Sequence, residues 1–470
     1  MSEKFDIVVV GSGPGGYSAA IRCAQRGASV AVVEKSFIGG TCLNCGCIPS
    51  KTLLASAHVL LAMKHASLMG VDVTATVPNW PNIQKRKDVV VTGFRKGLTG
   101  LIQSNKIKIF PGRGIVTAPG KITIDSDTSS TQIEADNIIL ATGSSPVEIP
   151  SIPFDGKTVI SSKEALSLEQ IPASMVIVGG GVIGCEMACV YAAMGTKVTI
   201  IEALSRLIPM EDAWVGRLME REFKKLGIES ITEQKVVSVD TTPPRRFASQ
   251  SEAAGAKVVL ESGRQIEAEK VLISVGRRAT VDKETIEALN LQMNGSIIGV
   301  DKKMQTNVPG VYAIGDAVGT TYLAHGAFAE AEVAAANATG SDEEIADYSL
   351  IPRAVYTFPE IASVGMTEEA CNAQGLDITI GKSFFKANGR SCAHNETTGE
   401  IRVIRDNSTD KILGVSMVGS IVTELVGAAR TLIGSTEKIT EISFPHPTVS
   451  EVLKEATEDA FGLSLHNPPH

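Results

Sequence analysis

Short apolar runs recur along the chain, and the first two enclose a glycine-rich stretch. Residues 7–10 (IVVV) and residues 30–33 (VAVV) consist of strand-forming side chains with no polar residue among them, which predicts two buried strands. The residues between them begin with closely spaced glycines and continue in a helical pattern that ends at Gly27. The opening segment is therefore predicted to be a strand–loop–helix–strand unit, which is typical of a parallel α/β sheet.

The same unit occurs again 168 residues later (179 − 11). Residues 176–178 (VIV) and residues 198–201 (VTII) are the strands of the second copy, and Gly195 ends the helix between them. Each copy carries a G-x-G-x-x-G sequence after its first strand and an acid at the end of its second strand. These residues are Gly11, Gly13, Gly16 and Glu34 in the first copy, and Gly179, Gly181, Gly184 and Glu202 in the second copy.

This spacing suits the binding of a dinucleotide. The first glycine permits a tight turn, the second lets the backbone approach a pyrophosphate, and the third lets the helix pack closely on the strand. The pyrophosphate then faces the free N–H groups of a helix N-terminus, while the acid accepts hydrogen bonds from ribose hydroxyls. Two generic glycine-rich turns are the alternative, but they would not place both acids in register. We expect two dinucleotide sites that exchange electrons.

Three further apolar runs are predicted to extend the two sheets. Residues 137–140 (NIIL) and residues 270–275 each lead to a glycine turn, so each run closes one nucleotide-binding domain. Residues 311–314 lead to Asp316, and an alanine-rich helix is expected over residues 324–338. An acid just after a strand can accept hydrogen bonds from the ribityl chain of a cofactor.

Composition limits the classes of protein that remain. A chain of 470 residues leads us to expect about three domains at roughly 150 residues each. Its 44 Lys and Arg against 52 Asp and Glu give a net charge of −8, which argues against coating nucleic acid or anionic lipid. No signal peptide is visible, and the most apolar window, residues 175–195, contains Glu186 and is broken by glycines, so we expect no membrane span. The expected location is the cytoplasm, or an organelle matrix after removal of a leader.

Three of the eight cysteines lie within six residues, at Cys42, Cys45 and Cys47, directly after the first repeat. The Cys42-x-x-Cys45 spacing is that of a zinc ligand pair, but no second C-x-x-C or histidine pair completes a set of four ligands, so no metal is expected. A structural disulfide is disfavoured in a chain without secretion signals. A redox-active disulfide beside a bound dinucleotide fits the cluster better.

These motifs resemble those of the pyridine nucleotide–disulfide oxidoreductase family along essentially the whole chain. They are GGTCLNCGCIPSK at 39–51, ATGS at 141–144, GGGVIGCE at 179–186, GRR at 276–278, AIGD at 313–316, LAH at 323–325, YTFPEIASVGMTE at 356–368 and HPTVSE at 446–451. The resemblance implies an α/β fold with two Rossmann-like dinucleotide-binding domains, for FAD and NAD, and a C-terminal α+β dimerisation domain. The implied segments are an FAD-binding domain at 1–148, an NAD-binding domain at 149–276, a central segment completing the FAD domain at 277–346, and an interface domain at 347–470.

The resemblance also assigns the redox chemistry to particular residues. It implies that Cys42 and Cys47 form the redox disulfide, with Cys42 exchanging with substrate and Cys47 facing the flavin. It further implies that Lys51, near the flavin, pairs with Glu186, which borders the nicotinamide.

An acid–base pair is implied near the other end of the chain. His446, held by Glu451, would exchange protons with the thiols and reach the disulfide of the partner subunit. A turn followed by a helix start would let Glu451 fold back onto His446, where a carboxylate fixes the tautomer and stabilises imidazolium. A surface histidine beside a helix cap is the alternative, which the cysteine cluster and the flavin context disfavour.

The remaining cofactor contacts rest on the same resemblance. Besides the first glycine loop and Glu34, the implied FAD contacts are Thr41, Lys51, Gly114, Thr142, Gly143, Ser144, Asp316, Ala324 and His325. Besides the second glycine loop, the implied NAD contacts are Glu202, Val236 and Gly276. The implied activity is oxidation of protein-bound dihydrolipoamide by NAD in a homodimer. The expected partner is therefore a lipoyl-bearing protein of a 2-oxo-acid dehydrogenase or glycine cleavage complex.

The chain departs from the family pattern at Cys45, where an aliphatic residue is usual. Packing as a small hydrophobic residue is favoured over service as an alternative disulfide partner. Two other kinds of reductase in the family are rivals: glutathione-type members usually carry Lys in place of Ser50, and mercuric members carry a C-terminal cysteine pair that this sequence lacks. A docking subunit with a vestigial flavin is a rival of another class, disfavoured by the intact set Cys42, Cys47, His446 and Glu451.

Overall fold

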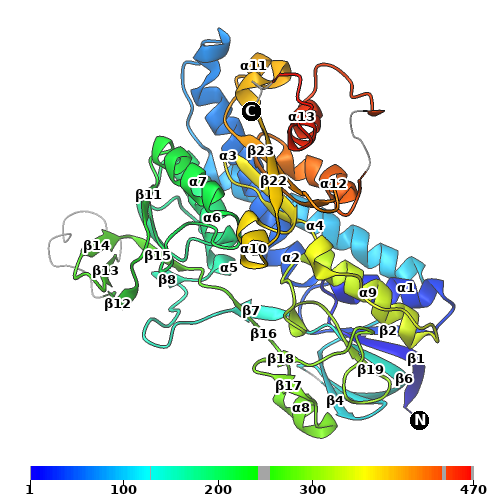
Figure 1. Ribbon diagram of the computed structural model, residues 1–470. Helices are drawn as coiled ribbons and strands as arrows, with labels where there is room; N and C mark the ends of the chain where they lie inside the picture. The colour runs from blue at the N-terminus through cyan, green and yellow to red at the C-terminus, as the bar shows by residue number, and fades with distance from the viewer. Residues whose placement is uncertain (1, 128, 242–254, 437–440, 467–470) are drawn as a thin grey trace. The chain divides into compact units, whose positions relative to one another are not determined.

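The computed structural model describes residues 2–127, 129–241, 255–436 and 441–466. The chain forms two compact units, each assembled from three separated segments, and Figure 1 shows its helices and strands in order along the chain. The first unit contains Met1–Thr52, Asn82–Val147 and Gly276–Tyr348, and the second contains Leu53–Pro81, Glu148–Val275 and Ser349–His470. The expected division into four segments stays a prediction.

The first unit is built on a seven-stranded sheet whose central strands are parallel. Val8 pairs with Ala31 on one side and with Ile138 on the other. These strands are continuous apolar runs because both faces of a parallel sheet are covered. The order is β3-β2-β1-β6-β5-β4 with β19 also paired to β6, where the strands are β1 (Glu3–Val10), β2 (Val30–Glu34), β3 (Lys108–Pro111), β4 (Arg113–Ala118), β5 (Lys121–Asp125), β6 (Ser130–Leu140) and β19 (Val311–Ala313).

Alternate residues of β1 enter two different hydrophobic clusters. Ile7 and Val9 pack with buried alanines of α1 (Pro14–Gln25) and α9 (Ala324–Ala338). The residues on the opposite face of β1 pack with side chains of the antiparallel strands and of α8 (Lys283–Leu289). The helix α9 has the bounds expected from the alanine-rich run, and it lies beside α1 in Figure 1.

The second copy of the repeat folds in the same way within the second unit. Val176 pairs with Thr199 and with Val271 in a five-stranded parallel sheet. The order is β11-β10-β9-β15-β8, where the strands are β8 (Val159–Ile160), β9 (Ser174–Val178), β10 (Lys197–Ile201), β11 (Glu229–Ile231) and β15 (Lys270–Ile273). The other elements of this part are α5 (Ser162–Ala165), α6 (Val182–Met194), α7 (Ala213–Lys225) and an antiparallel sheet of β12 (Val236–Asp240), β13 (Ala256–Leu260) and β14 (Gln265–Ala268).

The C-terminal part of the second unit is an antiparallel sheet with a helix packed directly on its edge strand. A Cβ atom on Gly381 in that strand would lie 2.1 Å from the Ala456 carbonyl oxygen, so only glycine allows this approach. The helix that packs there carries Glu451 in its first turn. The sheet order is β20-β21-β24-β23-β22, with β20 (Arg353–Val355), β21 (Glu360–Gly365), β22 (Ile378–Phe384), β23 (Glu400–Asp406), β24 (Ile412–Gly419), α10 (Glu368–Ala373), α11 (Gly389–Ala393), α12 (Val422–Leu432) and α13 (Ser450–Ala460).

The chain leaves and re-enters the first unit through a two-stranded ribbon. β7 (Ser144–Pro146) pairs antiparallel with β16 (Arg277–Ala279). The Val147 N–H donates to the Gly276 carbonyl oxygen at 3.0 Å. Val147 is the last residue before the chain leaves the first unit, and Gly276 is the first residue after it returns. A small hairpin follows, formed by β17 (Met293–Asn294) and β18 (Ile297–Ile298).

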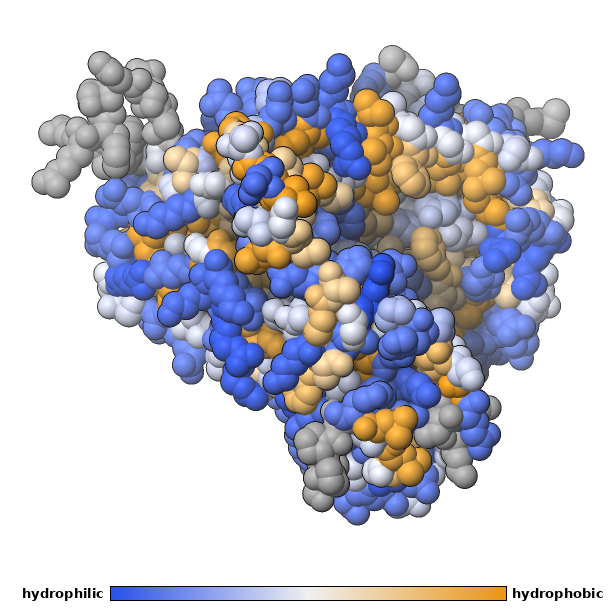
Figure 2. Space-filling model, turned by 90° about the horizontal axis from the view of Figure 1, so that it is seen from above, coloured by the Kyte–Doolittle hydropathy of each residue, from blue (hydrophilic) through white to orange (hydrophobic). Residues whose placement is uncertain are grey.

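One helical stretch in the described residues, Gly40–Lys64, is long and apolar enough to cross a membrane. The most apolar window of the sequence, residues 175–195, instead holds β9 and the shorter helix α6. The stretch Gly40–Lys64 is divided at Gly46 into two helices, α2 (Gly40–Cys45) and α3 (Cys47–Lys64), so length and composition alone do not make it a span. Hydrophilic residues cover most of the face seen in Figure 2, where apolar residues form separate patches.

Candidate active site

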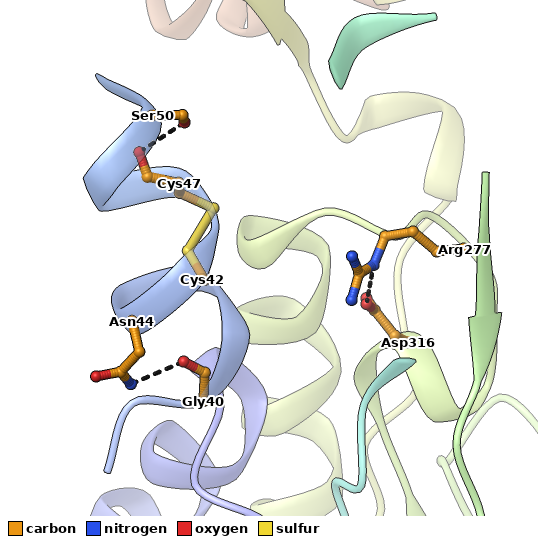
Figure 3. Close-up of a disulfide and its surroundings, with 7 residues drawn as sticks. All are labelled: Gly40, Cys42, Asn44, Cys47, Ser50, Arg277 and Asp316. Carbon is orange, nitrogen blue, oxygen red and sulfur yellow. Dashed lines mark hydrogen bonds and ion pairs between the residues drawn. A yellow bond between two sulfur atoms is a disulfide. The ribbon is translucent and has the colours of Figure 1, made fainter. Parts of the chain in front are cut away.

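Two of the clustered cysteines form a disulfide. Cys42 lies in α2, Cys47 is the first residue of α3, and their sulfur atoms are bonded, as Figure 3 shows. The two Cα atoms are 4.7 Å apart, which is within the usual range for this bond. Gly46 separates the helices, and a Cβ atom there would lie 3.0 Å from the Thr41 carbonyl oxygen. A larger residue at position 46 would therefore push the two helices apart.

The start of α3 favours a negatively charged sulfur at Cys47. Free N–H groups and the helix dipole stabilise the thiolate form of a cysteine at a helix N-terminus. The first turn is closed by Ser50, whose Oγ donates to the Cys47 carbonyl oxygen at 3.1 Å and whose N–H donates to the Gly46 carbonyl oxygen at 3.0 Å. After reduction of the disulfide, Cys47 is therefore the sulfur better placed to stay ionised.

Asn44, between the two cysteines, anchors α2 to the loop before it. Its Nδ2 donates to the carbonyl oxygens of Gly40 and Ile38 at 2.8 and 3.0 Å, and Figure 3 shows the first of these bonds. Its Oδ1 accepts from Arg95 Nε at 2.8 Å. Sequence reasoning missed both roles: Asn44 stands inside the cysteine motif, but no sequence signal points to Arg95.

Cys45, the third cysteine of the cluster, ends α2 and is half-buried. It is not part of the disulfide, which joins Cys42 and Cys47. Across the parts of the chain that the structure describes, no group of three or more His, Cys, Asp or Glu side chains is arranged to hold a metal ion. The Cys42-x-x-Cys45 spacing therefore builds no ligand set there.

The residues expected at the first dinucleotide site follow strands that end together. Val10 pairs with Val33 and Leu140, and Leu140 pairs with Ala313, so four neighbouring parallel strands finish at one edge of the sheet. Ligands of open α/β sheets bind outside the carboxyl ends of the strands. The segments at or after these ends contain the first glycine loop, Glu34, Thr142, Gly143, Ser144 and Asp316.

The first glycine loop has open space at one of its three glycines. Gly11 has φ +99°, and a Cβ there would lie 2.3 Å from the Ala141 carbonyl oxygen, while a Cβ on Gly16 would lie 2.0 Å from the Gly11 carbonyl oxygen. The fold itself therefore requires these two glycines. Gly13, the N-cap of α1, has an ordinary φ of −62°, and no other described residue comes within 4 Å of a Cβ there. A ligand at the helix N-terminus explains this glycine, which fits a pyrophosphate.

The second glycine loop repeats this arrangement. A Cβ on Gly179 would lie 2.5 Å from the Ser274 carbonyl oxygen, and a Cβ on Gly184 would lie 2.0 Å from the Gly179 carbonyl oxygen. Gly181, the N-cap of α6, has φ −77°, and again no other described residue comes within 4 Å of a Cβ there. The two loops therefore fit two dinucleotides, because the chain's own packing explains only the outer glycines of each.

The two acids of the repeats bind their own glycine loops. Glu34 Oε2 accepts the Ser12 N–H at 2.9 Å, and Glu202 Oε2 accepts the Gly180 N–H at 2.6 Å, so the bonds lie at matching positions. This contact was not expected from the sequence. A carboxylate has about four lone-pair sites, so each acid can orient its loop and still accept hydrogen bonds from a ribose.

The structure gives different reasons for other expected contacts of the first site. A Cβ on Gly114 would lie 3.0 Å from Val33 Cγ1, so the tight packing of β4 near β2 favours glycine at this position. Thr142 Oγ1, by contrast, is buried and has no hydrogen-bond partner among the described residues, which fits a bound ligand. The other expected contacts lie in the helices of the first unit: Thr41 in α2, Lys51 in α3, and Ala324 and His325 at the start of α9.

The residues expected around the second site are distributed over both units. Glu202 follows β10 and Val236 begins β12, whereas Gly276, with φ +130°, belongs to the first unit. Glu186 in α6 is only 4% exposed, and its Oε1 accepts a backbone N–H at 3.1 Å. Because Lys51 lies in the first unit, its expected pairing with Glu186 stays a prediction.

His446 and Glu451 are paired at the start of α13. His446 Nδ1 lies 3.0 Å from Glu451 Oε1, and Glu451 Oε2 accepts the Thr448 N–H at 2.7 Å. Burial alone would raise the pKa of Glu451, but the hydrogen bonds from Thr448 and His446 outweigh burial and lower the pKa. The carboxylate therefore stays ionised and holds Nδ1, while the side chain of His446 is 78% exposed. The approach of this pair to the disulfide stays a prediction.

Glu330, a buried acid that sequence reasoning missed, supports the Asp316 turn from α9. It is 1% exposed and accepts hydrogen bonds from the Gly315 N–H at 2.5 Å and from the Tyr348 hydroxyl at 2.9 Å. Burial, with a smaller contribution from the charge of Asp316, raises the pKa of Glu330 from 4.5 to about 7, although the hydrogen bonds from Gly315 and Tyr348 act to lower it. This carboxyl therefore titrates near neutral pH directly behind the turn.

Glu330→Gln should flatten the dependence of thermal stability on pH. An acid whose pKa is raised on folding stabilises the native state below pH 4.5, and this contribution is lost as the pH rises through about 7. Glutamine stays neutral, can accept the Gly315 N–H and can donate to Tyr348, so the variant should be on the order of 1–3 kcal/mol more stable than the native chain at pH 8 and similar to it at pH 5. Melting temperatures at both pH values measure this.

The control is Glu332→Gln, which changes an exposed acid of the same helix that pairs with Arg22. It should leave the difference in melting temperature between pH 5 and pH 8 close to the native one. An identical difference in Glu330→Gln would show that Glu330 does not titrate in this range.

Comparison with known proteins identifies the family. A sequence model of the pyridine nucleotide-disulphide oxidoreductase family matches residues 5–336, and a model of its dimerisation domain matches residues 351–457. The chain is 38% identical over 468 residues to dihydrolipoyl dehydrogenase of Bacillus subtilis, covering 98% of this chain and 99% of that protein. It is 39% identical over 477 residues to dihydrolipoyl dehydrogenase of Chlamydia trachomatis, covering 100% of this chain and 99% of that protein.

A solved structure has the same architecture. LpdA from Mycobacterium tuberculosis superposes with a TM-score of 0.88 at 26% identity, covering 97% of this chain and 99% of that one. This chain therefore belongs to the pyridine nucleotide-disulphide oxidoreductase family. The family resemblance and the fold class that the motifs predicted are confirmed.

Proposed function

We propose that this chain is a dihydrolipoyl dehydrogenase that oxidises protein-bound dihydrolipoamide to lipoamide and reduces NAD to NADH by way of FAD. The observation that carries the proposal is the Cys42–Cys47 disulfide at the start of α3, in a chain with two dinucleotide loops. The full-length relatives with this activity in their names support the choice of a dithiol substrate.

The disulfide and the His446–Glu451 pair would carry the thiol chemistry. One substrate thiol, after loss of its proton to His446 Nε2, attacks Cys42 Sγ, which forms a mixed disulfide and releases Cys47 as a thiolate. The second substrate thiol attacks the substrate sulfur of that mixed disulfide and releases Cys42, which takes up the proton of this second thiol. The substrate thereby loses two electrons, and these electrons reduce the Cys42–Cys47 disulfide to two separate cysteines. Bound FAD supplies the redox chemistry that carries the two electrons onward to NAD.

The first glycine loop, Glu34, Thr142 and Asp316 would hold FAD, and the second loop with Glu202 would hold NAD. The residues 351–457 that match the dimerisation domain support a homodimer. In that dimer His446 serves the disulfide of the partner subunit. We place the enzyme in the cytoplasm or in an organelle matrix, acting on the lipoyl-bearing protein of a 2-oxo-acid dehydrogenase or glycine cleavage complex.

The deciding experiment is a set of parallel steady-state assays on the purified protein. Dihydrolipoamide with NAD should give turnover, whereas glutathione disulfide with either reduced nicotinamide should give little. The preparation should be yellow, with one FAD per chain. A colourless folded protein that takes up no flavin, or one that prefers glutathione disulfide, would contradict the proposal.

NAD should be strongly preferred to its 2′-phosphorylated form. Glu202 would accept hydrogen bonds from the free ribose hydroxyls and repel a phosphate at that position. Glu202→Ala should lower the ratio of kcat/KM values for the two cofactors by about 10-fold, as expected for loss of one charge-assisted hydrogen bond. Glu261→Ala, at an exposed acid in a turn of the same unit, is the control. An unchanged ratio in Glu202→Ala would remove Glu202 from the site.

A further inference from the structure

Two consecutive hydrogen bonds connect Arg277, in the β7–β16 ribbon, to Asp316, the acid expected at the first dinucleotide site. Each of the two bonds can run in one direction only. Arg277 Nε donates to Ser144 Oγ at 2.7 Å, and Ser144 Oγ donates to Asp316 Oδ2. A guanidinium has donors only, so the Ser144 oxygen must accept from it and must turn its own proton away. The hydroxyl therefore donates this proton to Asp316 Oδ2.

Arg277 is held so that this direction does not reverse. Its Nη2 also donates to the Ser144 carbonyl oxygen at 2.8 Å, so two bonds run onto one residue in the fork geometry of a guanidinium. The same Nε lies 3.7 Å from Asp316 Oδ2, as the dashed line in Figure 3 marks. The Arg277 side chain is 15% exposed, and its backbone pairs with Pro146 across the ribbon. The positive charge is therefore shielded from water and fixed by two strands.

Asp316 keeps one carboxylate oxygen for a ligand. Oδ2 receives the Ser144 proton, whereas Oδ1 has no hydrogen-bond partner among the residues that the structure describes. Glu330 holds the same turn by accepting the Gly315 N–H. Hydrogen bonds from Ser144 and to Glu330 therefore fix the turn that carries Asp316. Asp316 Oδ1 is still able to accept a hydrogen bond, at the sheet edge where the glycine loop lies.

We propose that Arg277 is a positioning residue for the first dinucleotide site. It directs the Ser144 hydroxyl onto Asp316 Oδ2 and thereby presents Asp316 Oδ1 to a hydroxyl group of the bound FAD. The inference rests on the proposed function, because that function places FAD at this site. In this proposal Arg277 acts through Ser144 and Asp316 and not by contact with the cofactor. Because Arg277 belongs to β16, it also ties FAD binding to the ribbon through which the chain crosses between the units.

The test measures the dissociation constant of FAD from the flavin-depleted full chain by fluorescence titration, together with the melting temperature of that chain without FAD. Arg277→Gln should raise the Kd by about 10- to 100-fold, the factor expected for losing a charge-assisted hydrogen bond. Its melting temperature without FAD should stay close to the native value. Arg277→Lys keeps the positive charge but loses the two-pronged guanidinium, so its Kd should lie between the values of the native chain and of Arg277→Gln. If Arg277→Gln does not fold, Arg277→Lys is the variant that tests the proposal.

The control is Arg278→Gln, because Arg278 is the next residue of the same strand and its side chain is exposed. This variant should leave the Kd within about twofold of the native value, as surface substitutions usually do. An equal loss of affinity in both variants would assign the effect to the charge of the strand as a whole and overturn the proposal.

A double-mutant cycle separates this chain of hydrogen bonds from simple strand packing. Ser144→Ala interrupts it at the middle, so adding Arg277→Gln to Ser144→Ala should cost little further affinity. Additive losses, or an unchanged Kd in Arg277→Gln, overturn the proposal. A native chain that binds no FAD would overturn the proposed function as well. Unchanged FAD binding in Asp316→Asn would overturn the role of Arg277 together with the contact of Asp316 with FAD, and would leave the rest of the proposed function standing.

Discussion

Cys42→Ser and Cys47→Ser should each abolish the dithiol-driven reduction of NAD. A serine oxygen cannot form the bond that takes up two electrons from the substrate, so the loss should be on the order of 10⁴-fold or more. Neither cysteine belongs to a glycine loop, so both variants should still bind FAD and pass electrons from NADH to an artificial dye. Two assays on the same preparation, one with dihydrolipoamide and one with the dye, measure the difference.

Cys45→Ser is the matched control for these variants, because Cys45 lies between them in the sequence and outside the disulfide. Cys45 is half-buried and takes no part in the bond that accepts the electrons, so turnover should change little. If Cys45→Ser were as damaging as Cys42→Ser, the redox pair would include Cys45. If the dye assay failed in Cys42→Ser, the substitution would have disturbed the flavin site as well.

Much of the fold could be predicted because local pattern and local chemistry agree. The strands β1, β2, β9 and β10 arise at the apolar runs, and α9 spans the alanine-rich residues. Runs of β-branched residues bounded by glycine turns leave few alternatives to a buried strand. The repeat strengthens the prediction of the strand–loop–helix–strand unit, because two separate segments of the sequence have three glycines at the same spacing and in the same roles.

The contacts that orient the site could not be predicted, because they join residues far apart in the sequence. Arg277 meets Ser144 across 133 positions, and Asp316 meets Ser144 across 172 positions. The sequence around a single arginine does not indicate which distant residue will accept its hydrogen bonds. Glu330 is a similar case: one acid in an alanine-rich helix is compatible with a solvated face, and only the packing of α9 on its sheet buries it.

Gly114 is a residue that the sequence did single out but whose presence has a second explanation in the structure. The family resemblance assigns it to the FAD site, and this stays a prediction, because tight packing against Val33 already favours glycine there without a ligand. Gly13 and Gly181 carry more weight as evidence for ligands, because the packing of the chain does not require glycine at either position. The middle glycine of each loop is therefore the residue whose presence speaks for a ligand.

His446→Ala should lower dithiol oxidation by about 10²- to 10⁴-fold, the usual cost of removing a positioned general base. FAD binding should be unchanged, because the imidazole is exposed and lies in the other unit from the first glycine loop. Glu451→Ala should lose less, since Glu451 fixes the tautomer of His446 and does not itself take the substrate proton. Steady-state rates and flavin content of each variant measure both effects.

The chain offers a matched control in a second histidine that pairs with a glutamate of the same helix, α13. His466 Nδ1 lies 2.7 Å from Glu455 Oε1, and the His466 side chain is 71% exposed, so this pair resembles the His446–Glu451 pair in geometry and exposure. His466→Ala should leave dithiol oxidation close to the native rate. Equal losses in His446→Ala and His466→Ala would show that any exposed imidazole of this region, rather than a positioned base, accounts for the rate.

The strongest test of the proposed dimer is a heterodimer of Cys42→Ser and His446→Ala chains, isolated by two different affinity tags. If each site combines the disulfide of one subunit with the histidine of the other, one composite site holds both lesions and the second holds none. Such a heterodimer should have about half of the native activity, as two equivalent sites of a symmetric dimer require. If each site lies within one chain, both sites of the heterodimer carry a lesion, and no activity returns. Each parent homodimer should be inactive under either arrangement, so recovery itself decides between them.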